Sequence, residues 1–159
     1  ARLRENDHDV LTMDLRDADI KADLATDEGR ANAIAGIREA APAGLDGFVP
    51  CAGIGPHVQP ISLIPSINFF GAVSLTEALL PDLAKRKGSV VMISSNSSRM
   101  GDADPVFVEK LLEGDEAGAK AYIADKDGQT AYGHGKFALS VWMRRNAARF
   151  VAVTRKTPG

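Results

Sequence analysis

Short apolar runs alternate along the chain with segments of helical periodicity, and this alternation restricts the possible folds more than any other feature. Residues 10–13, 48–51, 90–93 and 151–154 are brief and mainly apolar, so each is predicted to be a buried strand. Apolar strands separated by helices form βαβ units on a parallel sheet with helices on both faces. The pattern therefore predicts an α/β fold with a parallel sheet inside three αβα layers.

The predicted helices have recognisable ends. Thr26 can cap a helix that stops at Pro42. An apolar helix is expected over residues 67–80, closed by Pro81, and a further helix over residues 132–150. Ligands of parallel sheets bind where the strands end, so the residues that follow each strand are the candidates for a functional site.

Residues 96–130 form a long interval before the last helix, with short helical stretches at 106–113 and 116–124. A segment of this size in a compact domain is usually a lid or a binding element. The alternative is that its apolar side chains pack against a second subunit. The side chains that can cover a hydrophobic ligand are Met100, Val106, Phe107, Val108, Leu111, Leu112, Tyr122 and Ile123.

The composition fits a single domain over residues 1–159 of a globular protein. A net charge of −2 offers no basic field for nucleic acid or anionic membranes, and no apolar run approaches the ~20 residues of a membrane span. The single cysteine, Cys51, cannot form an internal disulfide, and no Cys/His spacing predicts a metal site. We expect a cytoplasmic protein that binds no nucleic acid, membrane or metal.

Tyr132 and Lys136 stand four residues apart on a predicted helix, so both project from one face. A phenol is a poor base at neutral pH because its reference pKa is about 10. A lysine ammonium nearby favours the phenolate, and the tyrosine can then exchange a proton with an alcohol or carbonyl. Taken alone, the spacing describes a solvent-facing pair at least as well.

Other polar residues lie at positions suited to a site. Ser94 and Ser95 close the strand at residues 90–93, where a hydroxyl can bind a substrate oxygen or merely cap the next segment. Asn68 lies within a helix, a poor place for asparagine unless its amide has a partner. Its simpler role is a hydrogen bond that joins the helix to a loop.

Asp14 ends the first strand, where a carboxylate can grip the adenosine ribose diol and repel a 2′-phosphate. Arg16 weakens this preference, because an arginine can accept that phosphate. Asp23 and Leu24 are placed to border an adenine, although Asp23 equally suits the entry of a helix.

These strand ends and polar residues, taken in their order along the chain, resemble the short-chain dehydrogenase/reductase family over nearly the whole sequence. The ordered combination is far more specific than any single motif. The matching positions are Cys51-Ala52-Gly53 for the family's Asn-Ala-Gly, then Asn68, Ser95, the Tyr132-x-x-x-Lys136 pair and Pro158-Gly159.

The resemblance implies a Rossmann-like doubly wound sheet and an NAD(P)-dependent enzyme that interconverts an alcohol and a carbonyl. It implies that Tyr132 is the proton donor/acceptor, that Lys136 lowers its pKa and holds the nicotinamide ribose, that Ser95 orients the substrate oxygen and that Asn68 supports a proton relay. The implied cofactor is NAD, with NADP as the alternative, bound by Asp14, Leu15, Asp23, Leu24, Cys51, Ala52, Gly53, Tyr132, Lys136, Pro158 and Gly159.

Within the family, residues 13–19 and the long interval at 96–130 resemble the branch of bacterial hydroxysteroid dehydrogenases/carbonyl reductases and coniferyl-alcohol dehydrogenases. The branch implies a bulky hydrophobic alcohol or ketone, of steroid or phenylpropanoid type, as substrate. The resemblance also implies a homodimer or homotetramer. The alternative is a non-catalytic fragment or degenerate relative that keeps only the fold. A plain binding module would make the Ser/Tyr/Lys set a coincidence.

The chain also departs from the family pattern. The first βα unit, with its glycine-rich phosphate-binding turn, would precede Ala1, and residues 1–5 look like the tail of a helix. We therefore expect an incomplete domain whose sheet lacks a central strand, so that the flanking strands have unpaired amides. The segment that follows Gly159 in the family is expected to be lacking too, and Pro50 would remove a ladder donor from a central strand.

Overall fold

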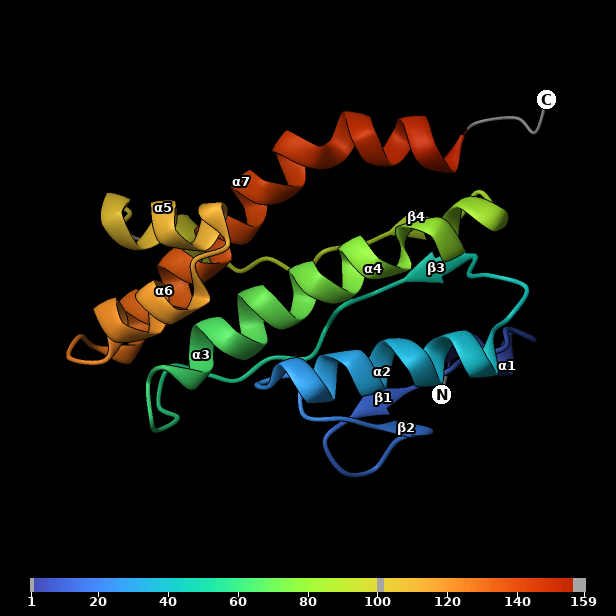
Figure 1. Ribbon diagram of the computed structural model, residues 1–159, viewed down its shortest axis with the longest axis horizontal. Coiled ribbons are helices and arrows are strands. Elements are labelled where there is room, and N and C mark those ends of the chain that lie inside the picture. The colour runs from blue at the N-terminus through green and yellow to red at the C-terminus, as the bar shows by residue number, and fades with distance from the viewer. Residues whose placement is uncertain (1, 100–101, 156–159) are drawn as a thin grey trace.

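The computed structural model describes residues 2–99 and 102–155, and Figure 1 shows α7 along the top, α4 through the middle and α2 below. The elements are α1 (Arg2–Glu5), β1 (Met13–Asp14), β2 (Ile20–Lys21), α2 (Asp27–Ala40), β3 (Gly47–Phe48), α3 (Leu63–Pro65), η1 (Ser66–Gly71), α4 (Ala72–Lys85), β4 (Ser89–Val90), η2 (Asn96–Arg99), α5 (Pro105–Glu113), α6 (Glu116–Ile123) and α7 (Gly128–Thr154).

The strands form two parallel pairs, β1 with β2 and β3 with β4. Each strand is only two residues long, shorter than expected, and within the described residues the two pairs are not joined by a ladder. Exposed apolar side chains lie just before or after the strands, including Leu11, Val49 and Val91. Parallel pairing is thus confirmed.

Helix α2 begins where the sequence predicts. The Thr26 hydroxyl accepts a hydrogen bond from the Gly29 amide, and Asp27 and Glu28 occupy the first turn, where negative charge is favoured. Ala33 and Ile37 are buried on one face of the helix, with Ala33 in a small cluster that also holds Leu24 and Leu75. The helix thereby covers the β1–β2 pair.

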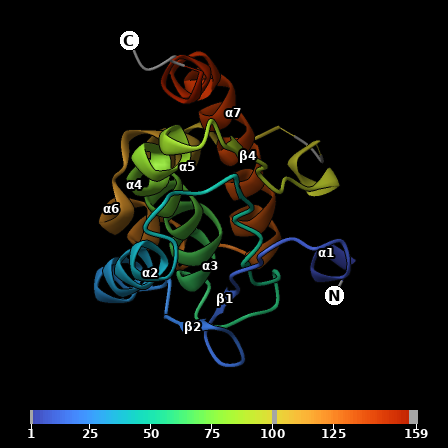
Figure 2. The same ribbon diagram turned by 90° about the vertical axis from the view of Figure 1, so that its right-hand side faces the viewer.

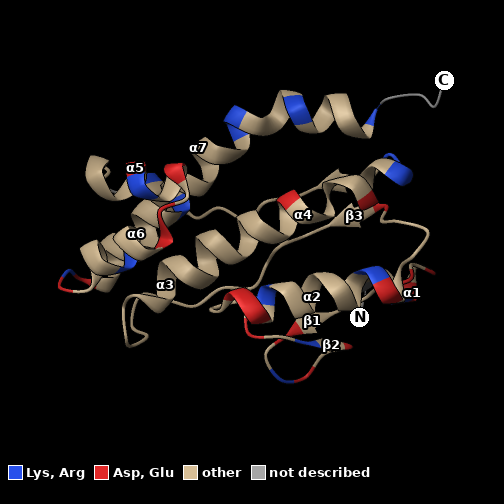
Figure 3. Cartoon of the chain, viewed as in Figure 1, with Lys and Arg blue, Asp and Glu red and all other residues tan. Residues whose placement is uncertain are grey.

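The core helix is longer than predicted and runs from α3 through η1 into α4. Pro81 does not close it: α4 continues to Lys85, because Leu83 beyond the proline is fully buried and Asp82 receives hydrogen bonds from Arg38 and Lys85. Tertiary packing therefore offsets the helical hydrogen bond that Pro81, which has no N–H, cannot donate. Figure 3 shows charged residues only toward the C-terminal part of this helix.

The same helix corrects a second expectation. Leu63–Lys85 spans 23 residues, and by length and composition this helix is long and apolar enough to cross a membrane. The helix contacts α2 on one side and α7 on the other. Of its most apolar stretch, 67% is buried inside the protein. Its apolar character is accounted for by the core of the domain.

The strand predicted at residues 151–154 is also wrong. Helix α7 continues without a break to Thr154, and its C-cap amide, from Arg155, donates to the Val151 carbonyl. No turn separates Phe150 from Val151 in the sequence. Phe150 is buried edge-on against Trp142, two turns earlier, which extends the helical packing to this point.

The long interval folds as the two predicted helices, α5 and α6. Asp104 and Asp115 cap their N-termini, and Gly114 ends α5 in the left-handed conformation. Figure 2 shows these helices and the η2 turn on opposite sides of α7.

The apolar side chains of the interval have a different role from the one expected. The side chains of Phe107, Leu111 and Ile123 are at most 1% exposed and lie in the main core cluster with residues of α7. They are therefore committed to packing and cannot cover a ligand. Val106 is exposed, and Met100 lies outside the described residues.

Candidate active site

Asn68 lies in η1, a six-residue π-helical stretch, and is buried. Its Oδ1 accepts a hydrogen bond from the Ile54 amide at 2.8 Å, and its Nδ2 donates to the Ile54 carbonyl at 2.9 Å. The side chain thus fastens the loop after β3 to the core helix, which is the simpler of the two roles predicted for it. A π-helical turn often marks a functional position in a long helix.

Tyr132 and Lys136 lie on the N-terminal half of α7, one turn apart and on one face of the helix. The Lys136 amine is buried, and its Nζ donates to the Ile93 carbonyl at 2.8 Å. Burial lowers the pKa of Lys136, and no carboxylate among the described residues lies close enough to offset this. Two of its three N–H groups remain for a ligand.

The solvent-facing alternative is therefore wrong for Lys136, which is 7% exposed. A buried amine without a counter-charge costs stability, since water is lost and only one hydrogen bond replaces it. Groups of this kind are commonly found where function requires them.

Replacement of Lys136 by methionine is expected to stabilise the chain by about 1 kcal/mol, because the buried charge is removed while its volume is kept. The lowered pKa means that the folded state binds this proton less tightly than the unfolded state. The gain should therefore be full at neutral pH and shrink as the pH rises toward 10.5, the ordinary value for lysine. Urea unfolding of Lys136→Met measures the gain in the free energy of unfolding, and Lys21→Met, the same change at an exposed lysine, is the control. A Lys136→Met protein that is less stable than the unmutated chain contradicts the account.

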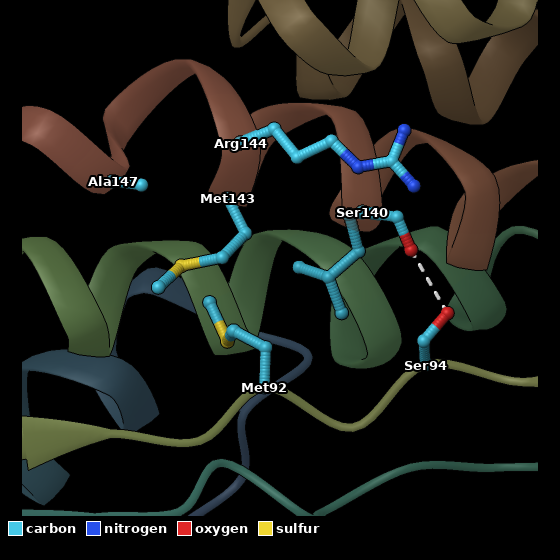
Figure 4. A pocket seen from close by; sticks show the side chains of 7 residues that line it. Met92, Ser94, Ser140, Met143, Arg144 and Ala147 are labelled. Atoms are coloured by element: carbon cyan, nitrogen blue, oxygen red, sulfur yellow. Dashed lines mark hydrogen bonds between the residues drawn. The ribbon is translucent and has the colours of Figure 1, made fainter.

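Ser94 and Ser95 follow the β4 segment, as predicted, and the two have different environments. The Ser95 hydroxyl accepts the Ser97 amide at 3.2 Å, while the Ser94 hydroxyl lies 2.8 Å from that of Ser140 on α7. Figure 4 shows this second contact beside a cavity of about 300 Å³. The cavity is lined by Met92, Ser94, Leu139, Ser140, Met143, Arg144 and Ala147.

A second, wider hollow of about 590 Å³ opens beside Ser95 and is bounded by Arg99 and Arg144. Tyr132 and Lys136 line neither space. The Lys136 amine binds the carbonyl of Ile93, and Ser95 follows two residues later. The two side chains do not line a common cavity.

On the predicted cofactor side, Asp14 ends β1 and is exposed, and its carboxylate accepts only the Arg16 amide, at 3.3 Å, within the described residues. Leu15 is exposed beside it. The Ala22 amide donates to the Asp14 carbonyl, which places the following Asp23–Leu24 turn near the end of β1. Asp14 is thus free to bind a polar ligand.

Asp23 has the second of its two predicted roles, at the entry of a helix. Its carboxylate accepts the Ala25 amide and its carbonyl accepts the Thr26 amide, which leads the chain into α2. Leu24 is buried and packs on Gly71 of η1, where an added Cβ would lie 3.1 Å from the leucine Cβ. The turn is therefore seated directly on the π-helical stretch that carries Asn68.

Cys51, Ala52 and Gly53 lead from β3 to Ile54, whose backbone binds Asn68. Cys51 is exposed and free. A Cβ on Gly53 would lie 3.2 Å from the Asn68 Oδ1, so a small residue suits this position. Pro158 and Gly159 lie outside the described residues.

Sequence reasoning missed several contacts that hold the site. The Asp104 amide donates to Nδ1 of His134 at 3.1 Å, and His134 lies between Tyr132 and Lys136. This bond joins the insert, the long interval at residues 96–130, to α7. Gly71 could have been noticed as a glycine inside an apolar helix, which usually has a packing reason. Nothing in the sequence marks the pairing of Asp104 with His134, which are 30 residues apart.

Comparison with known proteins identifies the class. Residues 9–105 match the short chain dehydrogenase family, and the chain belongs to that family. The chain is 39% identical over 147 residues to the 3-alpha-hydroxysteroid dehydrogenase/carbonyl reductase of Comamonas testosteroni, an alignment that covers 89% of this chain and 57% of the relative. The chain thus spans little more than half the length of this curated relative.

Solved structures agree. The 3-alpha-hydroxysteroid dehydrogenase of Pseudomonas sp. B-0831, complexed with NADH, superposes with a TM-score of 0.91 at 32% identity, over 95% of this chain and 61% of that one. A short chain dehydrogenase/reductase of Brucella ovis shares the fold, with a TM-score of 0.70 at 24% identity over 96% of this chain and 70% of that one. The predicted family and Rossmann-like αβα fold class are confirmed.

Proposed function

We propose that this chain forms the catalytic part of an NAD-dependent oxidoreductase that interconverts an alcohol and a carbonyl. The observation that carries the proposal is Lys136: a buried amine, one turn after Tyr132 on α7, held by the carbonyl of Ile93 just before Ser95. Family membership and the hydroxysteroid dehydrogenase relatives support the same activity.

Each proposed catalytic residue has a task that its chemistry suits. Tyr132 exchanges the proton with the substrate oxygen, and the Lys136 ammonium favours the phenolate form. The Ser95 hydroxyl orients the substrate oxygen, and Asn68 holds the loop at Ile54 in place beside the helix. When bound, NAD supplies the hydride acceptor.

The residues present fit such a cofactor. Lys136 has two N–H groups left to donate to ribose hydroxyls, and the exposed Asp14 carboxylate has acceptor capacity for the adenosine ribose. Leu15, Asp23, Leu24 and residues 51–53 complete the proposed binding set, together with Pro158 and Gly159. NAD is preferred over NADP because Asp14 would repel a 2′-phosphate.

In a chain extended at both ends, Asp14→Ala is expected to lower the affinity for NAD about tenfold and to leave NADP binding unchanged or improved, because a hydrogen-bond acceptor and a repelling charge are both lost. Asp17→Ala, which removes the same charge from the same exposed loop, is the control and should change neither value. Fluorescence titration with both reduced cofactors measures the effect. If the unmutated protein binds NADP as well as NAD, Arg16 decides the preference and the role given to Asp14 is wrong.

The proposed substrate is a neutral, ring-bearing alcohol or ketone of steroid type, with phenylpropanoid alcohols as the second class. The names of both relatives favour the steroid. The acidic insert, which holds Glu109 and Glu113 among its exposed residues, disfavours anionic substrates. A homodimeric or homotetrameric, cytoplasmic enzyme belongs to the same proposal; the non-catalytic alternative is not favoured.

The test is NADH-dependent reduction of a steroid ketone. It compares this chain with an extended chain, which adds the segments of the Comamonas relative that lie outside the alignment. We expect turnover in the extended chain and its loss when Tyr132 is replaced. An extended chain that folds and binds NADH, yet reduces neither steroid nor small ketones, would overturn the proposal.

A further inference from the structure

An ion pair between a buried arginine and a partly buried glutamate joins two segments that are 86 residues apart. The guanidinium of Arg30 on α2 binds both carboxylate oxygens of Glu116 on α6, at 2.6 and 2.8 Å. Burial alone would raise the pKa of Glu116, but the hydrogen bonds from Arg30 and Ser66 and the charges of Arg30 and Lys120 outweigh it and lower the pKa. The pair is therefore ionised at neutral pH.

Arg30 also binds three groups outside the insert. Its Nε donates to the Leu24 carbonyl at 2.8 Å, one Nη donates to the Ser66 carbonyl at 3.1 Å, and the other donates to Asp27 at 3.2 Å. With the two bonds to Glu116, all five guanidinium N–H groups are used. The side chain is 7% exposed, so its orientation is fixed by these partners.

Two of these partners belong to the proposed site. Leu24 lies in the turn that is proposed to border the adenine, and Ser66 begins η1, the stretch that carries Asn68. Arg30 thus holds the turn and the π-helical stretch at a fixed separation. Glu116, at the start of α6, binds Arg30 and so connects the insert to the Leu24 turn and to η1.

Stability alone is a weak explanation for this pair. Removing Arg30 fully and Glu116 partly from water costs free energy that offsets much of the attraction between them, so the pair contributes little net stability. Such pairs do fix geometry, because a planar guanidinium and a carboxylate meet in a single bidentate arrangement. A neighbouring pair, Arg38 with Asp82, already fastens α2 to α4.

We infer that Arg30 and Glu116 are positioning residues through which the insert sets the affinity of the adenine-side turn for the cofactor. The inference rests on the proposed function for what the turn binds. The mechanical link between the insert, the Leu24 turn and η1 stands on the hydrogen bonds alone. Neither residue is proposed to touch the substrate.

The first test measures the link without a cofactor, by hydrogen exchange of backbone amides in this chain. Glu116→Gln keeps the size of the side chain and loses its charge, and Arg30→Lys loses the planar fork. Both are expected to speed exchange about tenfold at residues 23–30 and 66–71, with the rest of the chain unchanged. The control is Glu113→Gln, the same change at an exposed position of α5 in the same insert. Uniform acceleration over the whole chain, or none, overturns the inference.

The second test measures the consequence in the extended chain. Glu116→Gln and Arg30→Lys should each raise the NADH dissociation constant about tenfold while kcat at saturating cofactor is kept. Arg38→Met, which loses an ion pair of the same helix, controls for general loosening of α2 and should leave the constant unchanged. An equal change in Arg38→Met, or none in the first two variants, contradicts the inference. If the unmutated protein binds no NADH, the proposed function fails while the exchange experiment still decides the link.

Discussion

Tyr132→Phe in the extended chain is expected to lower turnover by a factor of about 10²–10⁴, which is the usual contribution of a positioned proton donor. The phenyl ring keeps the packing of Tyr132 against the core cluster, so the fold should be unchanged. Only the exchangeable proton is lost, and NADH affinity should therefore be retained. Steady-state kinetics and a fluorescence titration on the same preparation separate the two quantities.

Tyr122→Phe supplies the matched control. The Tyr122 hydroxyl donates to the Asp104 carboxylate at 2.9 Å within the insert, so its removal costs a hydrogen bond worth about 1 kcal/mol of stability. Turnover should not change, because the bond to His134 comes from the Asp104 backbone amide and not from the carboxylate that Tyr122 binds. If Tyr132→Phe keeps the kcat of the unmutated enzyme, Tyr132 is not the proton donor.

Gly29→Ala is expected to destabilise the chain by about 1–3 kcal/mol, the range found when extra volume is forced into a packed region. A Cβ at this position would lie 1.9 Å from the Asp23 carbonyl oxygen and 2.7 Å from its carbon. Both atoms are backbone, so relief requires that the whole Asp23–Leu24 turn moves. NADH affinity should fall with stability, since this turn is the proposed adenine border.

The comparison is Gly36→Ala in the same helix. The atoms nearest to its Cβ would belong to the side chain of Ile20, at 3.3 Å and beyond, and this side chain can shift slightly. Alanine gains about 1 kcal/mol over glycine in a helix, so this variant should be as stable as the unmutated chain or more so. Urea unfolding of both variants measures the difference. Equal stabilities would show that the close approach at Gly29 does not exist in solution.

Much of the fold could be predicted because its signals are local. Thr26 caps α2, Asp104 and Asp115 lie where helices α5 and α6 begin, and the parallel pairing follows from apolar strands separated by helices. Asn68 is the clearest case in the site. An amide within an apolar helix requires a partner, and both of its groups bind Ile54.

The errors have a common cause, which is that packing between distant segments outweighs local preference. Pro81 fails to end α4 because Leu83 beyond it is buried, and residues 151–154 remain helical because Phe150 packs on Trp142. The insert resembles a lid in the sequence because its apolar side chains are evident and their partners on α7 are not. The Arg30–Glu116 pair joins residues too far apart for any local pattern to show.

The most direct test of the central claim follows the hydride itself. The extended chain is supplied with a steroid ketone and with NADH in which both hydrogens of the reactive nicotinamide carbon are deuterium, and the alcohol product is analysed by mass spectrometry. We predict that deuterium appears on the carbon that bears the new hydroxyl, in the unmutated enzyme and not in Tyr132→Phe over the same period. Unlabelled alcohol, or no alcohol from a folded chain that binds NADH, would contradict the claim that this site transfers hydride with Tyr132 as the proton donor.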